Sequence, residues 1–326
     1  MNLGQYTTSN ETRRLSGQLQ QRGSQSGLPT PILFLFAAVF FAVGCVIILI
    51  GTKVIVVDPK TVHAPHWVLA VTGVVFSFGG MMIWSLLWRQ NVSARHAREA
   101  ARLYPGEQAL QDHKWDPRGH TPSRWAPVVK SIMGVLFLAV FLSMFNWWAF
   151  IKGGPFMVKA IVGLFDILLI LFVGYTCVLF GRALKFGDSR IHFVQFPYRL
   201  SEPVDIRWQA AHGIARVNKG SFTLRCVKEY YEQRGRGKNR TRSMVHEEIW
   251  SGRWHFDEPR NFTFSEQIEL RFEIPGDLPP THLHANLPVF WELEVKLDLP
   301  GLDFVQHYLV PIYEAQQTSA RTNIFP

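Results

Sequence analysis

Four long apolar runs occupy most of the first 184 residues, and no comparable run follows them. They cover residues 31–51, 67–88, 131–151 and 157–181, and each is about 21 to 25 residues long. A helix rises about 1.5 Å per residue, so about 20 apolar residues cross the ~30 Å hydrocarbon core of a bilayer. The pattern predicts a four-transmembrane-helix bundle over residues 31–184, with a polar loop at residues 89–130 inside it.

The periodicity changes in the rest of the chain. Apolar and charged residues alternate without a break from Ile268 to Ile274, and residues 289–297 alternate in a similar way. Such alternation is typical of a β-strand with one buried face. Less regular strands are expected near residues 190–196, 204–209, 221–232, 244–256 and 304–313, between turns rich in Gly and Pro. The pattern predicts an antiparallel β-sandwich over residues 185–315, and therefore an α + β membrane protein.

The two ends of the chain show neither pattern. Residues 1–30 are rich in Ser, Gln, Thr and Gly and offer almost no apolar side chains to bury. A segment that buries so little cannot offset the entropy lost on ordering, so we expect residues 1–30 to be disordered. Residues 316–326 are expected to form a short tail after the sandwich.

The distribution of charge gives the predicted bundle a direction. The net charge is +9, and the mean hydropathy of +0.05 averages an apolar half and a polar half. Lys and Arg are frequent before the first run, in the 89–130 loop and after the fourth run, but scarce in residues 52–66 and 152–156. The positive-inside rule therefore predicts that both termini and the 89–130 loop are cytoplasmic.

Asp166 is the one acidic residue well inside an apolar run, and its candidate partners are Asn146, Lys152 and Lys159. A charged carboxylate inside a bilayer costs several kcal/mol, so such a residue is a candidate functional site. In one interpretation Asp166 and Asn146 form a proton or ion site. In the other, which we favour, Asp166 is a hydrogen-bonded side chain that holds two helices together, because repeat symmetry and broken helices are not evident.

Two polar stretches are candidate binding sites. His113, Asp116 and His120 lie close together in the 89–130 loop, but their spacing matches no standard metal-ligand set. We interpret this stretch, with Trp115, as a turn or amphipathic segment on the inner leaflet. The second stretch is a basic run, interleaved with Gly and Asn at the tip of a predicted long hairpin, made of Arg234, Arg236, Lys238, Arg240 and Arg242.

The basic run can be a solvated loop or can contact anionic lipid, because each basic residue near a charged leaflet contributes about 1 kcal/mol. Nucleic-acid binding is not expected, since no aromatic residues interleave the run. The nearby His246, Glu247 and Glu248 do not predict an active site, because successive side chains of a strand point to opposite faces.

Two stretches carry a family resemblance. FEIPGDLPPT (residues 272–281) and WELEVKLDLPGLDFVQHYLVPIY (residues 291–313) resemble the end of an arrestin-like (immunoglobulin-like) β-sandwich. The layout, including the loop YPGEQALQDHKWDPRG, resembles a group of uncharacterised bacterial inner-membrane proteins with transmembrane helices first and such a sandwich last. The resemblance implies a fold and a bacterial inner-membrane location, but no activity. Only one sandwich lobe fits the length, so arrestin-type receptor binding is not implied.

Together these features predict a non-enzymatic, multi-pass protein of the bacterial inner membrane. Its bundle is expected to anchor a cytoplasmic β-sandwich that binds a protein partner, for example through a strand edge. No cofactor or metal is expected, and the other partners considered are the lipid bilayer and a second copy of the chain. The alternatives are a small transporter or channel component that uses Asp166, and a membrane enzyme with a site around His113, Asp116 and His120.

Overall fold

The computed structural model describes residues 5–16, 22, 30–57, 65–104, 107–234, 241–263, 266–285 and 287–314. The chain forms two compact units: a helical unit of Ser26–Arg95 and Ser123–Lys185, and a β unit of Met1–Gln25, His96–Pro122 and Phe186–Pro326. The division differs from the expected one, because the N-terminal segment and most of the 89–130 loop belong with the β unit.

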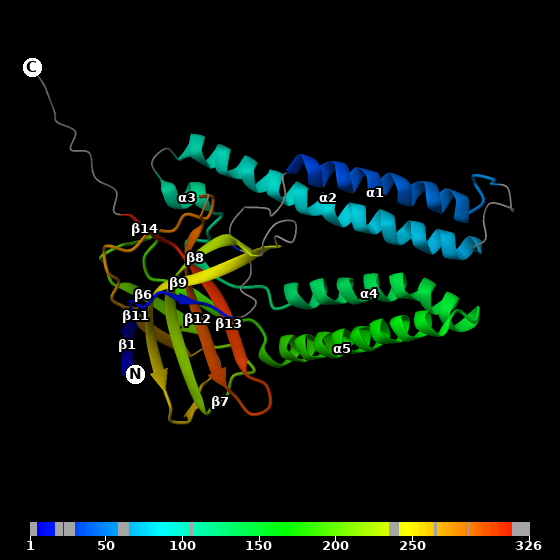
Figure 1. Ribbon diagram of the computed structural model, residues 1–326. Helices are drawn as coiled ribbons and strands as arrows, with labels where there is room; N and C mark the ends of the chain where they lie inside the picture. Colours follow the sequence, from blue (N-terminus) through cyan, green and yellow to red (C-terminus); the bar gives the residue numbers. More distant parts are fainter. Residues whose placement is uncertain are drawn as a thin grey trace, which may run out of the picture. The chain divides into compact units, whose positions relative to one another are not determined.

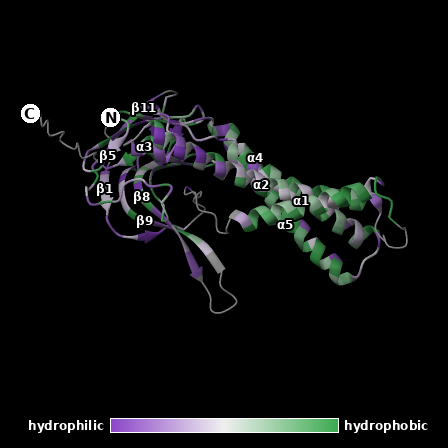
Figure 2. Ribbon diagram, turned by 90° about the horizontal axis from the view of Figure 1, so that it is seen from above, coloured by the Kyte–Doolittle hydropathy of each residue, from purple (hydrophilic) through white to green (hydrophobic). Residues whose placement is uncertain are grey.

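The helical unit contains four long apolar helices (Figure 1). They are α1 (Thr30–Gly51), α2 (His66–Leu103), α4 (Ala126–Asn146) with the π-helix η1 (Trp147–Ile151), and α5 (Phe156–Phe186). The segments apolar enough to cross a membrane are Pro31–Gly51, His66–Ser85, Ala126–Ile151 and Phe156–Phe186, and Figure 2 shows their hydrophobic colour. The four predicted spans are therefore present as helices, with ends that differ by a few residues.

Small and hydroxyl-bearing residues bring these helices together. A Cβ added at Gly73 of α2 would lie 2.6 Å from the Gly44 carbonyl oxygen of α1, so only glycine permits this approach. Between α4 and α5, the hydroxyls of Ser131 and Thr176 lie 2.7 Å apart and form a buried hydrogen bond. The rings of Trp67 and Trp147 meet at 5.6 Å and join α2 to η1.

The β unit is built from two main sheets (Figure 1). The large sheet has the order β1-β9-β8-β12-β13, with β2 also paired to β9. Its strands are β1 (Gln5–Ser9), β2 (Arg13–Arg14), β8 (Lys219–Arg234), β9 (Thr241–Phe256), β12 (Val289–Asp298) and β13 (Phe304–Val310). The small sheet has the order β11-β6-β4-β3. Its strands are β3 (Gly119–His120), β4 (Arg190–Phe193), β6 (Val204–Gln209) and β11 (Gln267–Phe272).

Two short strand pairs and one short helix complete the described part of the β unit. The pair β7 (Arg216–Val217) and β10 (Arg260–Asn261) is antiparallel, like all pairs of the two main sheets. The pair β5 (Tyr198–Arg199) and β14 (Ile312–Tyr313) is parallel. The helix α3 (Gln108–Asp112) lies in the loop between the second and third apolar helices.

The main core of the β unit lies between the two sheets. Along β11, burial follows the predicted alternation, with Ile268, Leu270 and Phe272 buried. Trp208 of β6 crosses the gap: its ring packs 5.3 Å from Phe222, and its indole N–H donates to the Tyr308 hydroxyl at 3.1 Å. Two antiparallel layers thus share one core, as the alternating pattern predicts.

The expectation of disorder over residues 1–30 is wrong for the part that the structure describes. Gln5–Ser9 pairs with β9 from Ser251 to His255, and Arg13–Arg14 pairs with Glu247–Glu248. The Leu15 amide continues this pairing to the His246 carbonyl at 3.0 Å. The sequence argument considered only burial by the segment itself, whereas the backbone bonds here come from an existing strand edge.

Candidate functional site

The strongest candidate site is the outer face of the large sheet, defined as the side chains of β8, β9, β12 and β13 that point away from the main core. The strand register arranges these side chains in rows. Glu292 lies opposite Arg225. Glu294 lies opposite Thr223, and Thr223 lies opposite Arg253. The face is therefore polar in sequence, yet several of its charged residues are buried.

Arg225 is the centre of a buried ion network on this face. It donates from Nε and Nη2 to Glu292 Oε1 at 2.8 and 2.6 Å, and its Nη1 lies 3.1 Å from Glu294 Oε1. The Arg225 and Glu292 side chains are only 4% and 1% exposed. Charge-assisted hydrogen bonds of this kind are strong and directional, so the two carboxylates are fixed in place.

The network also sets the protonation of its neighbours. Burial would raise the pKa of Glu294, but the charges of Arg225 and Lys296, with a hydrogen bond from Lys296, outweigh it and the pKa is lowered. Burial lowers the pKa of His307, with Arg225 adding to the effect, so the ring is neutral at pH 7. A neutral ring lets His307 Nδ1 accept a hydrogen bond from Arg225 Nη2 at 3.2 Å.

A second acidic group lies further along the same face. Glu229 Oε2 lies 3.2 Å from His246 Nε2, and both side chains are buried. Glu248 is equally buried, and its carboxylate is paired with Arg13 of β2 at 3.2 Å. Since an unpaired buried carboxylate is costly, this part of the face requires positive charge from elsewhere in the chain.

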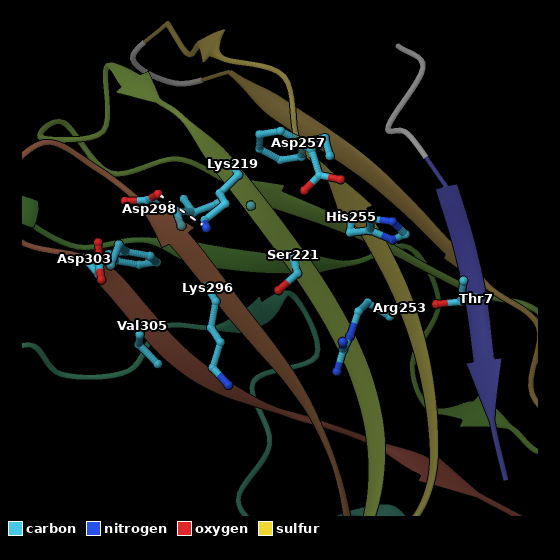
Figure 3. A pocket seen from close by; sticks show the side chains of 14 residues that line it. Thr7, Lys219, Ser221, Arg253, His255, Asp257, Lys296, Asp298, Asp303 and Val305 are labelled. Atoms are coloured by element: carbon cyan, nitrogen blue, oxygen red, sulfur yellow. Dashed lines mark ion pairs between the residues drawn. The ribbon is translucent and has the colours of Figure 1, made fainter. Parts of the chain in front are cut away.

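At the other end of the face, a cavity of about 440 Å³ opens over the ends of the strands (Figure 3). Ser221, Arg253, His255 and Lys296 line its floor, and Thr7 of β1 lies at one side (Figure 3). Its remaining charged lining residues are Lys219, Asp257, Asp298 and Asp303. The lining therefore carries charged side chains of both signs.

Several of these charged groups already have partners. Arg253 donates from Nε to the Thr223 hydroxyl at 3.2 Å, and Lys219 lies 4.0 Å from Asp298. Ser221 and His255 face each other across β8 and β9, but His255 Nδ1 is buried without a hydrogen-bond partner in the described structure. His246, Glu247, Glu248 and His255 are spread along β9, and Asp257 follows its last residue, so these five residues do not form one cluster.

The predicted pair in the membrane is brought together by the structure. Asn146, the last residue of α4, donates from Nδ2 to Asp166 Oδ1 on α5 at 2.9 Å. The same Nδ2 lies 3.3 Å from the Leu142 carbonyl oxygen. The contact links two neighbouring helices, which is the geometry expected of a structural hydrogen bond.

The His and Asp residues of the loop have separate partners. His113 packs against Trp115 at 4.8 Å, Asp116 pairs with Arg190 at 3.3 Å, and His120 belongs to β3. Burial lowers the pKa of His120 to about 4, and the charges of Arg22 and His113 add to this. Among the described residues, no group of three or more His, Cys, Asp or Glu is arranged to hold a metal.

The interpretation of the loop as a segment on the lipid surface is wrong for Trp115. Its ring is buried in a second core on the outer side of the large sheet, beside Phe290 and Leu309. Its indole N–H donates to the Tyr313 hydroxyl at 3.1 Å. Asp112 fixes the same loop, because its carboxylate accepts bonds from the Leu283 and His284 amides and the Tyr313 hydroxyl.

The basic run lies largely outside the described residues. Arg236, Lys238 and Arg240 are not described, and the side chains of Arg234 and Arg242 are not described either. The backbone pairing of Gln233 with Arg242 and of Arg234 with Thr241 shows the two long strands that lead to the run. The predicted hairpin is therefore present, while its contact with lipid stays a prediction.

Sequence reasoning missed the buried network, although one signal pointed to it. The alternation of residues 289–297 places Glu292 and Glu294 on one face, and such a face is normally solvated. Arg225 interrupts the apolar stretch Leu224–Val227 and lies directly opposite Glu292 in the register. The register itself was needed to see that these charges meet.

Comparison with known proteins gives a structural similarity but no family match. No protein-family model matches the sequence, and no curated protein matches it significantly. Among solved structures, the chain is similar to Spo0M, a sporulation control protein from Bacillus subtilis, at 17% sequence identity and a TM-score of 0.23. The match covers 39% of this chain and 49% of that chain, so it spans about half the length of Spo0M. We draw no functional conclusion from this similarity.

Proposed function

We propose that this chain is a non-enzymatic, multi-pass membrane protein whose helical unit anchors a β unit that binds a protein partner through the outer face of its large sheet. The observation that carries the proposal is the outer face itself. Its charged residues are held by a buried network around Arg225, and a cavity opens beside them. Preorganised polar groups lose less entropy on binding, so such a face favours a specific partner.

The chemistry of the buried groups supports binding over catalysis. The Arg225 guanidinium is already used by two carboxylates, and the lowered pKa of His307 favours its neutral form. Burial raises the pKa of the Cys226 thiol to about 12, so it is protonated at neutral pH. A catalytic thiol or base needs a pKa near the working pH and access to substrate, and these groups lack such properties.

The location belongs to the same proposal. Four helices are apolar enough to span a membrane, and the charge asymmetry favours cytoplasmic termini and a cytoplasmic β unit. The resemblance of residues 272–281 and 291–313 to the arrestin-like class supports a bacterial inner-membrane protein with one sandwich lobe. The two facing sheets of the β unit are compatible with that class.

Photocrosslinking in cells tests the proposed binding face. A photoreactive residue at Lys296, whose side chain is 54% exposed on the outer face, should form a product of defined mass with a partner. The matched control is Glu269 of β11, which is 77% exposed on the small sheet. No product from Lys296, or an equal product from Glu269, would contradict the proposal.

The alternative function is a small transporter or channel component that uses Asp166. The hydrogen bond from Asn146 is the observation that favours testing it, since it brings two polar groups together between α4 and α5. Proton or ion flux in proteoliposomes separates the two functions. The alternative requires flux in the wild type and its loss in Asp166→Asn, whereas our proposal expects no flux in either protein.

A further inference from the structure

The N-terminal arm, defined as the described residues 5–16 and 22, lies on the large sheet in the manner of a bound peptide. It is the last strand at one edge, because β9 pairs with β8 on one side and with β1 and β2 on the other. Without the arm, β9 would offer its backbone donors and acceptors to any extended chain. Strand addition to an open edge is a common mode of peptide recognition.

Tyr6 is the apolar anchor of the arm. Its ring packs 4.9 Å from Trp254 and 6.3 Å from Phe272, and its hydroxyl accepts a bond from the Glu273 amide at 3.3 Å. Gly252 makes room for this ring, since a Cβ there would lie 2.7 Å from the Tyr6 hydroxyl oxygen. The edge of the sheet thus has a binding position for the side chain of a tyrosine, with apolar contacts for its ring and a hydrogen bond for its hydroxyl.

Arginines form the second part of the fit. Arg13 contacts both carboxylate oxygens of Glu248, at 3.2 and 3.4 Å. Arg14 contacts both oxygens of Glu232, at 3.3 and 3.1 Å. Arg14 uses two nitrogens, Nη1 and Nη2, and a lysine ammonium cannot reproduce that paired geometry, whereas Arg13 makes both of its contacts from Nη2 alone.

Arg22 connects the arm to the buried carboxylates of Glu229 and Glu292. Its backbone amide donates to Glu229 Oε2 at 3.0 Å, and its Nη2 lies 3.9 Å from Glu292 Oε2. Glu229 is 1% exposed, and its other oxygen has no hydrogen-bond partner among the described residues. Glu229 Oε1 is therefore a buried acceptor that a positively charged or donor group could use.

The charge balance shows what kind of chain the face accepts. Its carboxylates are Glu229, Glu232, Glu248, Glu292 and Glu294, and Arg225 supplies positive charge from within the sheet. The arm brings three arginines to these groups. The side chains of Arg13 and Arg14 are 59% and 52% exposed, while their partners Glu248 and Glu232 are 4% and 30% exposed, so the two arginines reach these carboxylates from the solvent side.

We propose that the β9 edge and its acidic group form a docking site for an extended protein segment that carries an aromatic residue followed by an arginine pair. The chain's own arm occupies the site in cis, and a partner segment of the same chemistry binds when the arm leaves. The inference rests on the proposed function and names the chemistry of the partner. A tethered arm acts at a high effective concentration, so it competes strongly with a free segment.

A labelled peptide of residues 1–25, measured by fluorescence anisotropy against the full chain in nanodiscs, tests the inference. Two variants release the site: deletion of residues 2–25, and Tyr6→Ala combined with Arg13→Glu and Arg14→Glu in the full chain. Both should bind the peptide at least tenfold more tightly than the wild type, whose arm competes. Peptides carrying Tyr6→Ala, or Arg13→Glu with Arg14→Glu, should lose at least tenfold in affinity.

Equal binding by the wild type and by a folded variant, or equal binding of the altered peptides, would overturn the inference. The full-chain variant keeps the test valid if the deletion does not fold, with circular dichroism as the check. Failure of the two proposals is distinguishable. A crosslink from Lys296 without peptide binding removes only this inference, whereas peptide binding without a crosslink removes only the proposed partner at the cavity.

Discussion

Arg225 contacts two buried carboxylates, and Lys296 and Arg22 bring further positive charge to Glu294 and Glu292. Burying an ion pair gains little over burying apolar groups, because the charges lose their hydration. The geometry is nevertheless demanding, since Glu292 accepts two bonds from the same guanidinium. A pair of this kind is better explained by specific placement of the carboxylates than by stability.

Replacing Arg225 with Met should lower the free energy of unfolding of the β unit by about 3 to 5 kcal/mol, because Glu292 would remain buried without its counter-charge. Urea denaturation followed by tryptophan fluorescence measures the change. Arg207→Met is the matched control, since its pair with Glu269 is 48% and 77% exposed. That variant should change stability by less than about 1 kcal/mol. Equal losses in both variants would show that the network is not buried as described.

His120 should make the β unit sensitive to acid. Its pKa is lowered by burial to about 4 in the folded chain, against 6.5 when exposed, so protons bind preferentially to the unfolded chain. The associated stability is present above about pH 6.5 and is lost as the pH falls towards 4. Between pH 7 and pH 5 the loss amounts to about 2 kcal/mol. In His120→Gln the dependence on pH should flatten by that amount, and an unchanged dependence would contradict the assignment.

At the scale of elements, the loop that contains α3 (residues 107–120) is fixed to the β unit by hydrogen bonds and by a buried tryptophan; we call this contact the clamp. Asp112 accepts two backbone bonds from the 283–284 turn and one from Tyr313, and Trp115 fills the second core. Its strand β3 adds to the edge of the small sheet through β4. A connection between two apolar helices therefore also contributes structure to the β unit.

Asp112→Ala should weaken this clamp, because the Leu283 and His284 amides lose their acceptor. Buried donors left unpaired cost about 1 to 3 kcal/mol each, so we expect a loss of about 2 to 3 kcal/mol in stability. Hydrogen exchange should report faster exchange at residues 107–120 and 283–284. Glu269→Ala, whose pair with Arg207 is exposed on the small sheet, serves as the control and should leave those amides protected.

The elements that were predicted correctly are those whose signal lies within one stretch of sequence. A membrane-crossing helix leaves an uninterrupted apolar run, and β11 leaves a faultless alternation. The strands β1 and β2 were missed because their stability comes from β9, more than 200 residues away in the chain. The role of Trp115 was missed for the same reason, since a tryptophan near basic residues suits a membrane surface and a distant core equally well.

In the candidate sites, too, contacts between neighbouring segments could be expected from the sequence, whereas contacts between distant strands could not. Asn146 was one of three partners expected for Asp166 from the sequence, because they lie toward the same side of the predicted bundle, and the structure joins Asn146 to Asp166. The network of Arg225 with Glu292 and Glu294 depends on strand register, which fixes side-chain neighbours only after the order of strands is known. The pairing of the N-terminal arm with the sheet could not be predicted, because it depends on the free edge of β9 and on the contact of Tyr6 with Trp254.

At the scale of the whole molecule, one chain contains an apolar helical unit and a β unit with a proposed binding face. The long helices cannot be explained as parts of a soluble domain, because most of their large apolar side chains are exposed in the isolated chain. Lipid around the helices removes that exposed surface from water. Insertion in a membrane is the central claim, and the charge asymmetry adds the proposal that the β unit lies on the cytoplasmic side.

Labelling with a membrane-impermeant maleimide tests that claim most directly. Single cysteines are placed at Lys296 in the β unit and at Val56 in the turn after α1, both exposed, in a chain whose native cysteines are replaced by alanine. The account predicts that Lys296→Cys reacts in inverted membrane vesicles and not in intact spheroplasts, while Val56→Cys reacts in spheroplasts and not in inverted vesicles. Labelling of Lys296→Cys in intact spheroplasts, or of both positions from the same side, would contradict it.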